Sequence, residues 1–252
     1  MCWCIVLSAH RILRDSERTI VLAVNYPPPD IVRLDALLDR IYDYVSGVKI
    51  GLPYMLRYGL KNISNLISSR RDKYYFIADL KLADIADVML PVVDELSVAG
   101  FQGVVSHAFV GYKGALEPLS SRVKELGMEL FLQVSLPHEG AGEVIDQSYH
   151  LIKNVVNLTD ASGLIIPASK GFMIREIRSS FGKRHVILAS GILRMGAKPG
   201  EGICSGADAE VVGRAITLST NPESATREII SSQRVYVESR RGECVSLREY
   251  PL

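Results

Sequence analysis

Residues 74–87 read YYFIADLKLADIAD, and this stretch decides how the rest of the chain is interpreted. Its aromatic and apolar beginning is typical of a buried strand, whereas its end carries Asp79, Lys81 and Asp84. Alternation along a strand places Ile77, Asp79 and Lys81 on one face. Burying such charges is costly unless they are paired, so charges at the mouth of a buried strand indicate chemistry. A plain ion pair, with Asp84 as a helix N-cap, is the structural alternative.

The same alternation of apolar runs and helical patterns extends over most of the chain. Strands are predicted at 19–25, 48–51, 74–81, 103–107, 129–135, 163–167, 185–189 and 210–213, with helices at 31–45, 52–71, 84–99, 112–126, 143–160, 172–181 and from 214. Strands that alternate with helices indicate a parallel sheet, and eight such units fit a (β/α)8 TIM barrel. We therefore predict an α/β single-domain barrel over residues 19–235, with an N-terminal lead-in at 1–18 and a polar C-terminal tail at 236–252. An open doubly wound sheet is the alternative, but no Gly-x-Gly-x-x-Gly follows the first strand.

The composition narrows the classes of function. Of 252 residues, 48% are hydrophobic and 23% charged, which is typical of a soluble globular protein. Lys plus Arg is 29 and Asp plus Glu is 28, so no basic excess favours a nucleic-acid partner. No apolar run is long enough to span a membrane, and residues 1–9 make a poor signal peptide. Cys2, Cys4, Cys204 and Cys244 show no zinc or Cys-x-x-Cys spacing, so we expect reduced thiols and a cytoplasmic protein.

The polar residues fall where a barrel carries its functional groups, at the carboxyl ends of the strands. Asn25, Lys49, Asp79 and Lys81 end or lie within the first three predicted strands and are expected to converge at one rim. A cluster of alternating cations and anions can hold a lysine charged and directed.

A second group of residues follows the last two predicted strands. Ser190-Gly191 and Gly213-Arg214 stand where this fold often binds phosphate, because glycine permits close backbone approach and arginine can form a bidentate clamp. No second histidine or carboxylate stands at metal-ligand spacing in the sequence around His138 or His185. We therefore predict an anion site there and no metal site.

The pattern Asp79-x-Lys81-x-x-Asp84, together with Val48-Lys49-Ile50-Gly51 and Val212-Gly213-Arg214, resembles the orotidine 5′-phosphate decarboxylase family, archaeal type, over roughly residues 18–235. The resemblance implies a homodimer that converts orotidine 5′-phosphate to uridine 5′-phosphate without a cofactor, in de novo pyrimidine biosynthesis.

The resemblance also implies catalytic roles. Lys81 would protonate the ring carbon that loses carbon dioxide, and Asp79 would face the leaving carboxylate. Lys49 would help to fix Lys81, and Asp84 would reach into the partner's site and touch the ribose.

Substrate contacts follow from the same resemblance. Arg214, with amides near Gly191 and Gly213, would grip the phosphate. Ile85 and Pro167 would line the site, and Ser135 would contact the pyrimidine.

The sequence departs from the family pattern at two places. Asn25 stands where the family usually has an aspartate, and Met195, next to Arg194, stands where it usually has a glutamine above the phosphate. These changes motivate one alternative, a decarboxylase-like protein that binds a nucleotide with weak or no turnover. The second alternative is a metal-dependent sugar-phosphate lyase or synthase, such as hexulose-phosphate synthase. Lys49 argues against this alternative, because it stands where those enzymes carry a metal-binding glutamate.

Overall fold

A closed barrel of eight parallel strands forms the centre of the protein, with neighbouring strands following one another in chain order. The computed structural model describes residues 8–14, 17–26 and 29–245. The strands are β1 (Ile20–Val24), β2 (Val45–Gly51), β3 (Tyr75–Leu82), β4 (Gly103–His107), β5 (Glu129–Gln133), β6 (Gly163–Pro167), β7 (Val186–Ser190) and β8 (Ala209–Val212). The predicted (β/α)8 barrel is confirmed.

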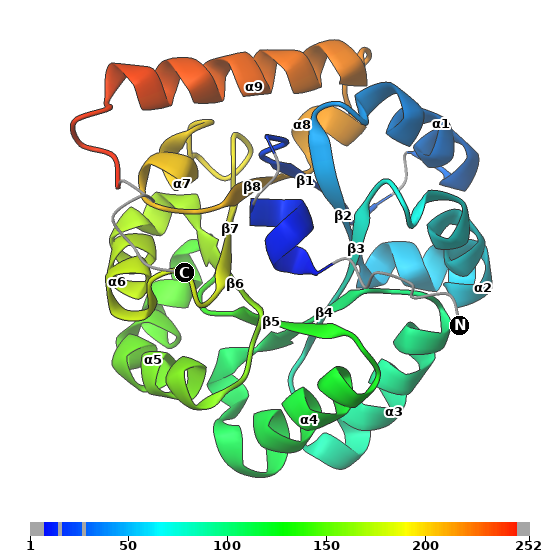
Figure 1. Ribbon diagram of the computed structural model, residues 1–252, viewed down its shortest axis with the longest axis vertical. Helices are drawn as coiled ribbons and strands as arrows, with labels where there is room; N and C mark the ends of the chain where they lie inside the picture. Colours follow the sequence, from blue (N-terminus) through cyan, green and yellow to red (C-terminus); the bar gives the residue numbers. More distant parts are fainter. Residues whose placement is uncertain (1–7, 15–16, 27–28, 246–252) are drawn as a thin grey trace.

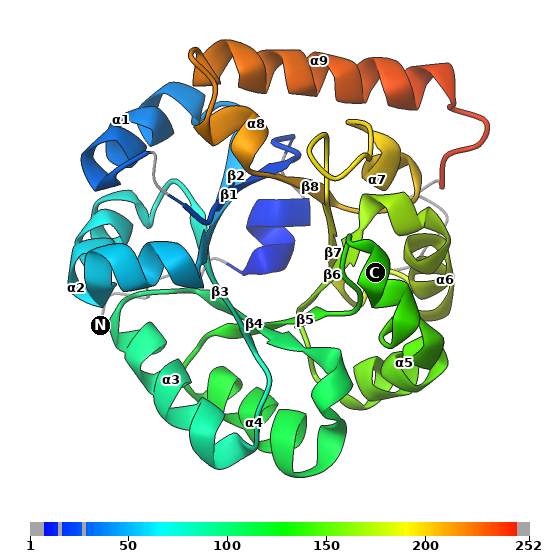
Figure 2. The same ribbon diagram turned by 180° about the vertical axis from the view of Figure 1, so that it is seen from behind.

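Helices form a ring around the outside of this barrel, as Figures 1 and 2 show from its two ends. They are α1 (Ile31–Ile41), α2 (Leu52–Arg70), α3 (Ala86–Val98), α4 (Glu117–Glu125), α5 (Tyr149–Leu158), α6 (Gly171–Phe181), α7 (Glu201–Cys204), α8 (Arg214–Thr217) and α9 (Pro222–Ser239). Within the described ranges, none of these helices combines the length and the apolar character needed to cross a membrane.

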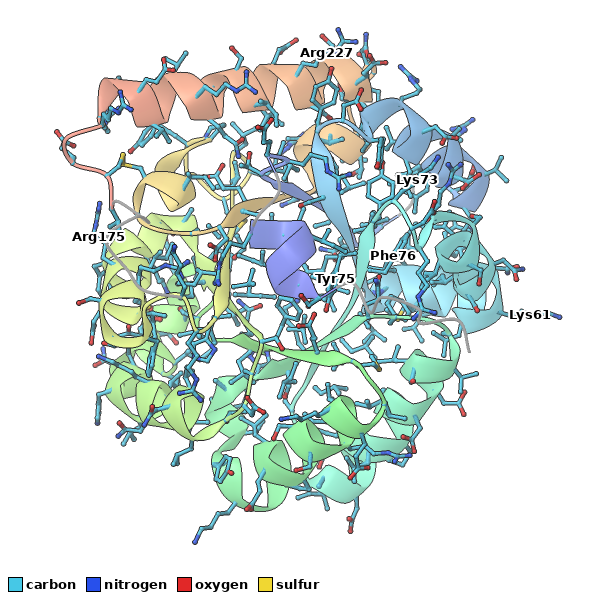
Figure 3. The ribbon with its side chains drawn as sticks, viewed as in Figure 1. Lys61, Lys73, Tyr75, Phe76, Arg175 and Arg227 are labelled. Carbon is cyan, nitrogen blue, oxygen red and sulfur yellow. A yellow bond between two sulfur atoms is a disulfide. The ribbon has the colours of Figure 1, made fainter. Side chains whose placement is uncertain are left out.

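The strands are buried on both faces, which explains their continuous apolar runs. Tyr75 belongs to the core inside the barrel, whereas its neighbour Phe76 belongs to the core between the sheet and the helices. Figure 3 shows the two rings on opposite sides of β3. The period of two along the strand thus supplies two separate cores.

A single π-helical turn, η1 (His10–Arg14), closes the amino-terminal end of the barrel (Figure 1). Ala9, Ile12 and Leu13 are buried in the same core as the barrel interior. The Ala9 amide donates to Glu129 Oε2 at 2.5 Å, at the first residue of β5. Part of the predicted lead-in is therefore integral to the barrel. No hydrophobic periodicity in residues 1–18 predicts this role.

Three predicted helices differ from the observed ones. The helix predicted over 143–160 is α-helical only in α5 (Tyr149–Leu158), and short 3-10 turns precede it. The helix predicted over 112–126 becomes α-helical only at Glu117, because Gly114 adopts a left-handed conformation with φ +73°. The helix predicted over 31–45 ends at Ile41, and β2 already begins at the buried, β-branched Val45. Neighbouring strands need matched lengths, so β2 extends back to pair with the start of β1.

A disulfide joins Cys204 at the end of α7 to Cys244. The expectation of reduced thiols is therefore wrong for this pair. The two cysteines are 40 residues apart, so no local sequence pattern indicates that they meet. Cys2 and Cys4 lie outside the described residues. The Val245 amide also donates to the Cys204 carbonyl at 2.9 Å. Helix α9 runs to Ser239, past the predicted start of the tail, so the disulfide fastens the segment after α9 to the loop region that follows β7.

Replacing both Cys204 and Cys244 with serine is expected to lower the free energy of unfolding by about 3–4 kcal/mol, because the closed loop no longer restricts the unfolded chain. Urea titration of the oxidised protein and the variant measures this difference. The wild type treated with dithiothreitol is the control and should match the variant. Equal stability in all three samples would contradict the prediction.

Candidate active site

The backbone of β3 departs from regular strand geometry just where its charged residues begin. Its register with β4 shifts between Ala78 and Leu82, and Lys81 takes φ +51°. A non-glycine residue in this left-handed region costs about 1–2 kcal/mol. Asp79 and Lys81 lie on one side of the strand, as alternation predicts, but Lys81 does so with a left-handed backbone conformation that alternation does not describe.

Three of the predicted catalytic residues meet at this point. The Lys81 ammonium lies 2.8 Å from both carboxylate oxygens of Asp79, and the Lys49 ammonium forms an ion pair with Asp79 Oδ2. The side chains of Asp79 and Lys49 are 1% and 7% exposed, whereas Lys81 is 35% exposed. Asp79 thus bridges two cations, and Lys81 is the one that faces open space.

The protonation of this cluster follows from burial and charge. Burial lowers the pKa of Lys49, and the nearby Lys81 charge lowers it further, although Asp79 opposes both effects. Burial would raise the pKa of Asp79, but the charges and hydrogen bonds of Lys49 and Lys81 outweigh it and lower that pKa. Asp79 is therefore held as a carboxylate.

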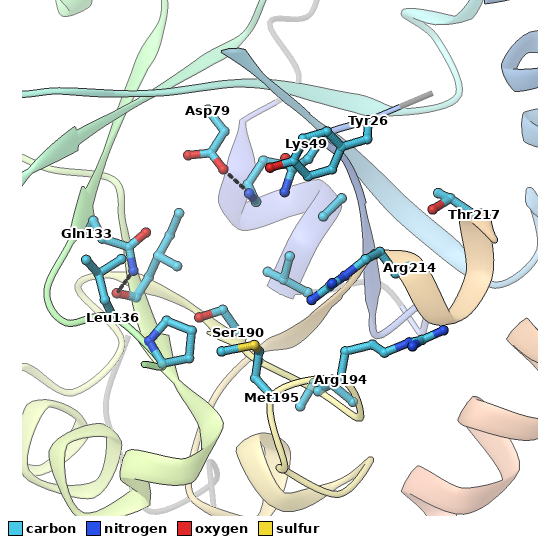
Figure 4. A pocket seen from close by; sticks show the side chains of 18 of the residues that line it. Tyr26, Lys49, Asp79, Gln133, Leu136, Ser190, Arg194, Met195, Arg214 and Thr217 are labelled. Atoms are coloured by element: carbon cyan, nitrogen blue, oxygen red, sulfur yellow. Dashed lines mark hydrogen bonds and ion pairs between the residues drawn. The ribbon is translucent and has the colours of Figure 1, made fainter. Parts of the chain in front are cut away.

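A cavity of about 550 Å³ opens above the cluster at the carboxyl end of the barrel (Figure 4). The side chains that carry charge on its wall are Lys49, Lys81, Arg194, Arg214 and Asp79. Four cations and one carboxylate give the wall an excess of three positive charges. Such a cavity suits a small ligand with more than one anionic group.

The residues predicted to bind phosphate lie together on the same cavity. Gly191, Met195, Gly213 and Arg214 all line it, as does Arg194. Gly191 has φ +86°, and a Cβ at that position would lie 3.2 Å from Pro137 Cβ, so the backbone approaches the opposite loop closely. Figure 4 shows Arg214 extending from the start of α8 into the cavity.

Asn25 also lines the cavity, one residue after β1. It packs against the end of β2, because a Cβ on Gly51 would lie 2.3 Å from Asn25 Oδ1. The amide thus lies on the same cavity wall as the lysine cluster.

Four predicted site residues do not line the cavity of this single chain. Asp84 is exposed, and its Oδ1 accepts a hydrogen bond of 2.7 Å from the Ile85 amide. Ile85 is 60% exposed, and Pro167 is buried. The Ser135 hydroxyl donates to Asp146 at 2.5 Å and accepts from Lys170 at 2.8 Å.

Three polar side chains of the cavity wall, those of Tyr26, Gln133 and Thr217, have no role predicted from the sequence. Ser190 is predicted only as part of the phosphate loop, but its side chain also lines the wall. For Gln133 the available signal is a polar residue directly after the apolar run LFL at 130–132, at the carboxyl end of β5.

The cluster offers little to a metal ion. No group of three or more His, Cys, Asp or Glu suited to holding a metal occurs within residues 8–14, 17–26 and 29–245. Asp79 already accepts from two ammonium groups, and β2 carries Lys49 rather than an acidic ligand. Carboxylate ligands for Mg²⁺ would need to be free of such partners.

His107 ends β4 close to the lysine cluster. Burial lowers its pKa, and the Lys81 charge lowers it further, with Asp79 opposing. The neutral imidazole therefore contributes stability above the unfolded pKa of about 6.5, and this contribution is lost as the pH falls toward the folded value. We expect His107→Gln to flatten the fall in unfolding free energy between pH 7 and pH 5, measured by urea titration. Parallel pH profiles of variant and wild type would contradict this.

Comparison with known proteins gives a consistent result. The model of the orotidine 5′-phosphate decarboxylase / HUMPS family matches residues 20–229. Orotidine 5′-phosphate decarboxylase of Sulfurisphaera tokodaii is 34% identical over 207 residues, covering 82% of this chain and 93% of the relative. The Aeropyrum pernix enzyme of the same name is 34% identical over 214 residues, covering 84% and 87%. The crystal structure of orotidine 5′-monophosphate decarboxylase from Sulfolobus solfataricus superposes with a TM-score of 0.79 at 28% identity, covering 88% of this chain and 100% of that one.

Proposed function

The chain belongs to the orotidine 5′-phosphate decarboxylase / HUMPS family, and we propose that it is a carboxy-lyase that converts orotidine 5′-phosphate to uridine 5′-phosphate. The observation that carries this proposal is the Lys49–Asp79–Lys81 cluster at the mouth of the barrel, on the wall of a cavity that also holds Arg214. The reaction would serve de novo pyrimidine biosynthesis and would use no cofactor.

Lys81 is the proposed proton donor. Cleavage of the bond between the ring and the carboxylate releases carbon dioxide and leaves the electron pair on the ring carbon. The Lys81 ammonium stabilises that developing charge and then transfers its proton to the same carbon, forming the new C–H bond. Asp79 holds the ammonium in place and faces the leaving carboxylate, and Lys49 keeps Asp79 ionised.

The charge of the cavity supports the same substrate. A phosphomonoester carries about −1.5 to −2 at neutral pH, and the orotate carboxylate adds another negative charge. The wall supplies an excess of three positive charges, with Arg214 and the backbone near Gly191 and Gly213 at the proposed phosphate end. Phosphate binding there would position the ring against Lys81. Asn25 would hydrogen-bond a ribose hydroxyl, and Met195 would lie over the phosphate in place of the usual glutamine.

We further propose a homodimer that completes each site with Asp84 from the partner. Asp84 lies just after β3 and is exposed, and exposed apolar side chains follow the carboxyl ends of β2, β3 and β4, which suits a subunit interface. These side chains are Leu52, Leu56, Ile85, Val88 and Phe109, which are 45–77% exposed. In such a dimer Ile85 would become buried and would border the ligand.

Loss of ultraviolet absorbance from orotidine 5′-phosphate, measured with pure protein and excess chelator, tests the proposed reaction. Turnover that persists in chelator supports the cofactor-free decarboxylase. Turnover that requires added Mg²⁺ would favour the sugar-phosphate lyase or synthase, and binding of uridine 5′-phosphate without turnover would favour the nucleotide-binding alternative motivated by Asn25 and Met195.

A further inference from the structure

We propose that Gln133 and Ser190 recognise the pyrimidine ring, with Gln133 accepting the ring N–H and Ser190 donating to a neighbouring ring carbonyl. This inference rests on the proposed function and extends it to the basis of base selection. Both side chains lie on the side of the cavity that carries Leu136, as Figure 4 shows.

The orientation of the Gln133 amide is fixed by its partners. Gln133 Nε2 donates to the Ser135 carbonyl at 2.6 Å and to the Ile165 carbonyl at 3.4 Å. Two carbonyl oxygens require the nitrogen on that side, so the alternative amide orientation is excluded chemically. The side-chain oxygen is left facing the cavity (Figure 4), where it can act only as an acceptor.

Ser190 contributes the complementary group. It ends β7 and lines the cavity, and its hydroxyl is a buried polar atom without a hydrogen-bond partner in the described part of the chain. A buried, unpaired hydroxyl costs about 1–3 kcal/mol unless a partner is supplied. A ligand carbonyl in the cavity would supply that partner.

An acceptor and a donor on one wall match the imide edge of a uracil or orotate ring, where an N–H stands between two carbonyl groups. Cytosine presents an unprotonated nitrogen at the central position. That lone pair would face the Gln133 oxygen and leave both acceptors unpaired, which a buried site penalises strongly. The two residues, on β5 and β7, flank Ile165 of β6, whose apolar side chain also lines the cavity.

Ser190→Ala separates a ligand-binding role from a structural one. Calorimetry with uridine 5′-phosphate should show affinity weakened about 5- to 10-fold. The melting temperature of the free protein should stay the same or rise, because an unpaired buried hydroxyl is removed. The matched control is Ser46→Ala: this buried β2 hydroxyl donates to the Ile20 carbonyl, so its loss should lower the melting temperature and leave affinity unchanged. Unchanged affinity in Ser190→Ala would overturn the assignment of Ser190.

Gln133→Met tests base selection, since methionine has similar length but no acceptor. The wild type should bind uridine 5′-phosphate at least about 20-fold more tightly than cytidine 5′-phosphate, and the variant should bring this ratio close to one. A wild-type ratio near one, or a ratio that survives the substitution, would overturn the proposal. If Gln133→Met does not fold, the wild-type ratio of the two affinities and the affinity of Ser190→Ala for uridine 5′-phosphate still test the proposal. A wild type that discriminates the bases but does not consume orotidine 5′-phosphate would refute the proposed reaction and leave base recognition standing.

Discussion

Replacing Lys81 with alanine is expected to reduce turnover of orotidine 5′-phosphate by about four orders of magnitude or more, because the variant loses both the proton donor and the cation nearest the developing charge. The protein should remain folded. Asp79 keeps its ion pair with Lys49, so no buried charge is left without a partner. Affinity for uridine 5′-phosphate should change by less than about tenfold, since Arg214 and the loops after β7 and β8 remain.

The measurement is the ultraviolet decarboxylation assay at saturating substrate, paired with calorimetry of uridine 5′-phosphate. Lys61→Ala is the matched control: Lys61 points away from the barrel on the outer surface of α2 (Figure 3), so its loss should leave both quantities unchanged. A Lys81→Ala variant with wild-type turnover would remove Lys81 from the mechanism. A variant that loses turnover together with its thermal transition would show that Lys81 supports the fold.

The architecture was predictable because a parallel barrel leaves a strong signal in sequence. Its strands are buried on both faces, so β1 and β6 are continuous apolar runs, and each is followed by an amphipathic helix. Lys49, Asp79 and Lys81 lie together in the structure because the carboxyl ends of neighbouring parallel strands share one rim.

The features that escaped prediction depend on contacts between distant residues. The Cys204–Cys244 disulfide and the closure of the barrel by residues 8–14 have no local period. The left-handed turn at Lys81 is invisible in a strand pattern, although it determines where the ammonium lies. The Ser135 hydroxyl could not be placed either, since its partners Asp146 and Lys170 belong to later segments.

Asp84→Ala is expected to inactivate the enzyme by about 100-fold or more, although Asp84 does not line the cavity of its own chain. The physical reason lies in the proposed dimer. No ion pair joins Asp84 to another residue of the described chain, and its carboxylate is exposed among apolar side chains such as Ile85 and Val88. An exposed carboxylate in an apolar surface gains a role once a second subunit covers that surface and presents a ribose to it.

Mixing two inactive variants distinguishes this role from one within a single chain. A dimer of one Asp84→Ala chain and one Lys81→Ala chain holds one site with both residues intact and one site with neither. Random pairing makes half of the dimers mixed, so co-expressed variants with two affinity tags should regain about a quarter of wild-type activity before separation. Purified mixed dimers should reach about half. If Asp84 acted on its own chain, every site would lack one residue and mixing would restore nothing. A monomer by analytical ultracentrifugation at assay concentration, still fully active, would equally rule out a shared site, because the residue that completes the cavity would then have to come from the same barrel.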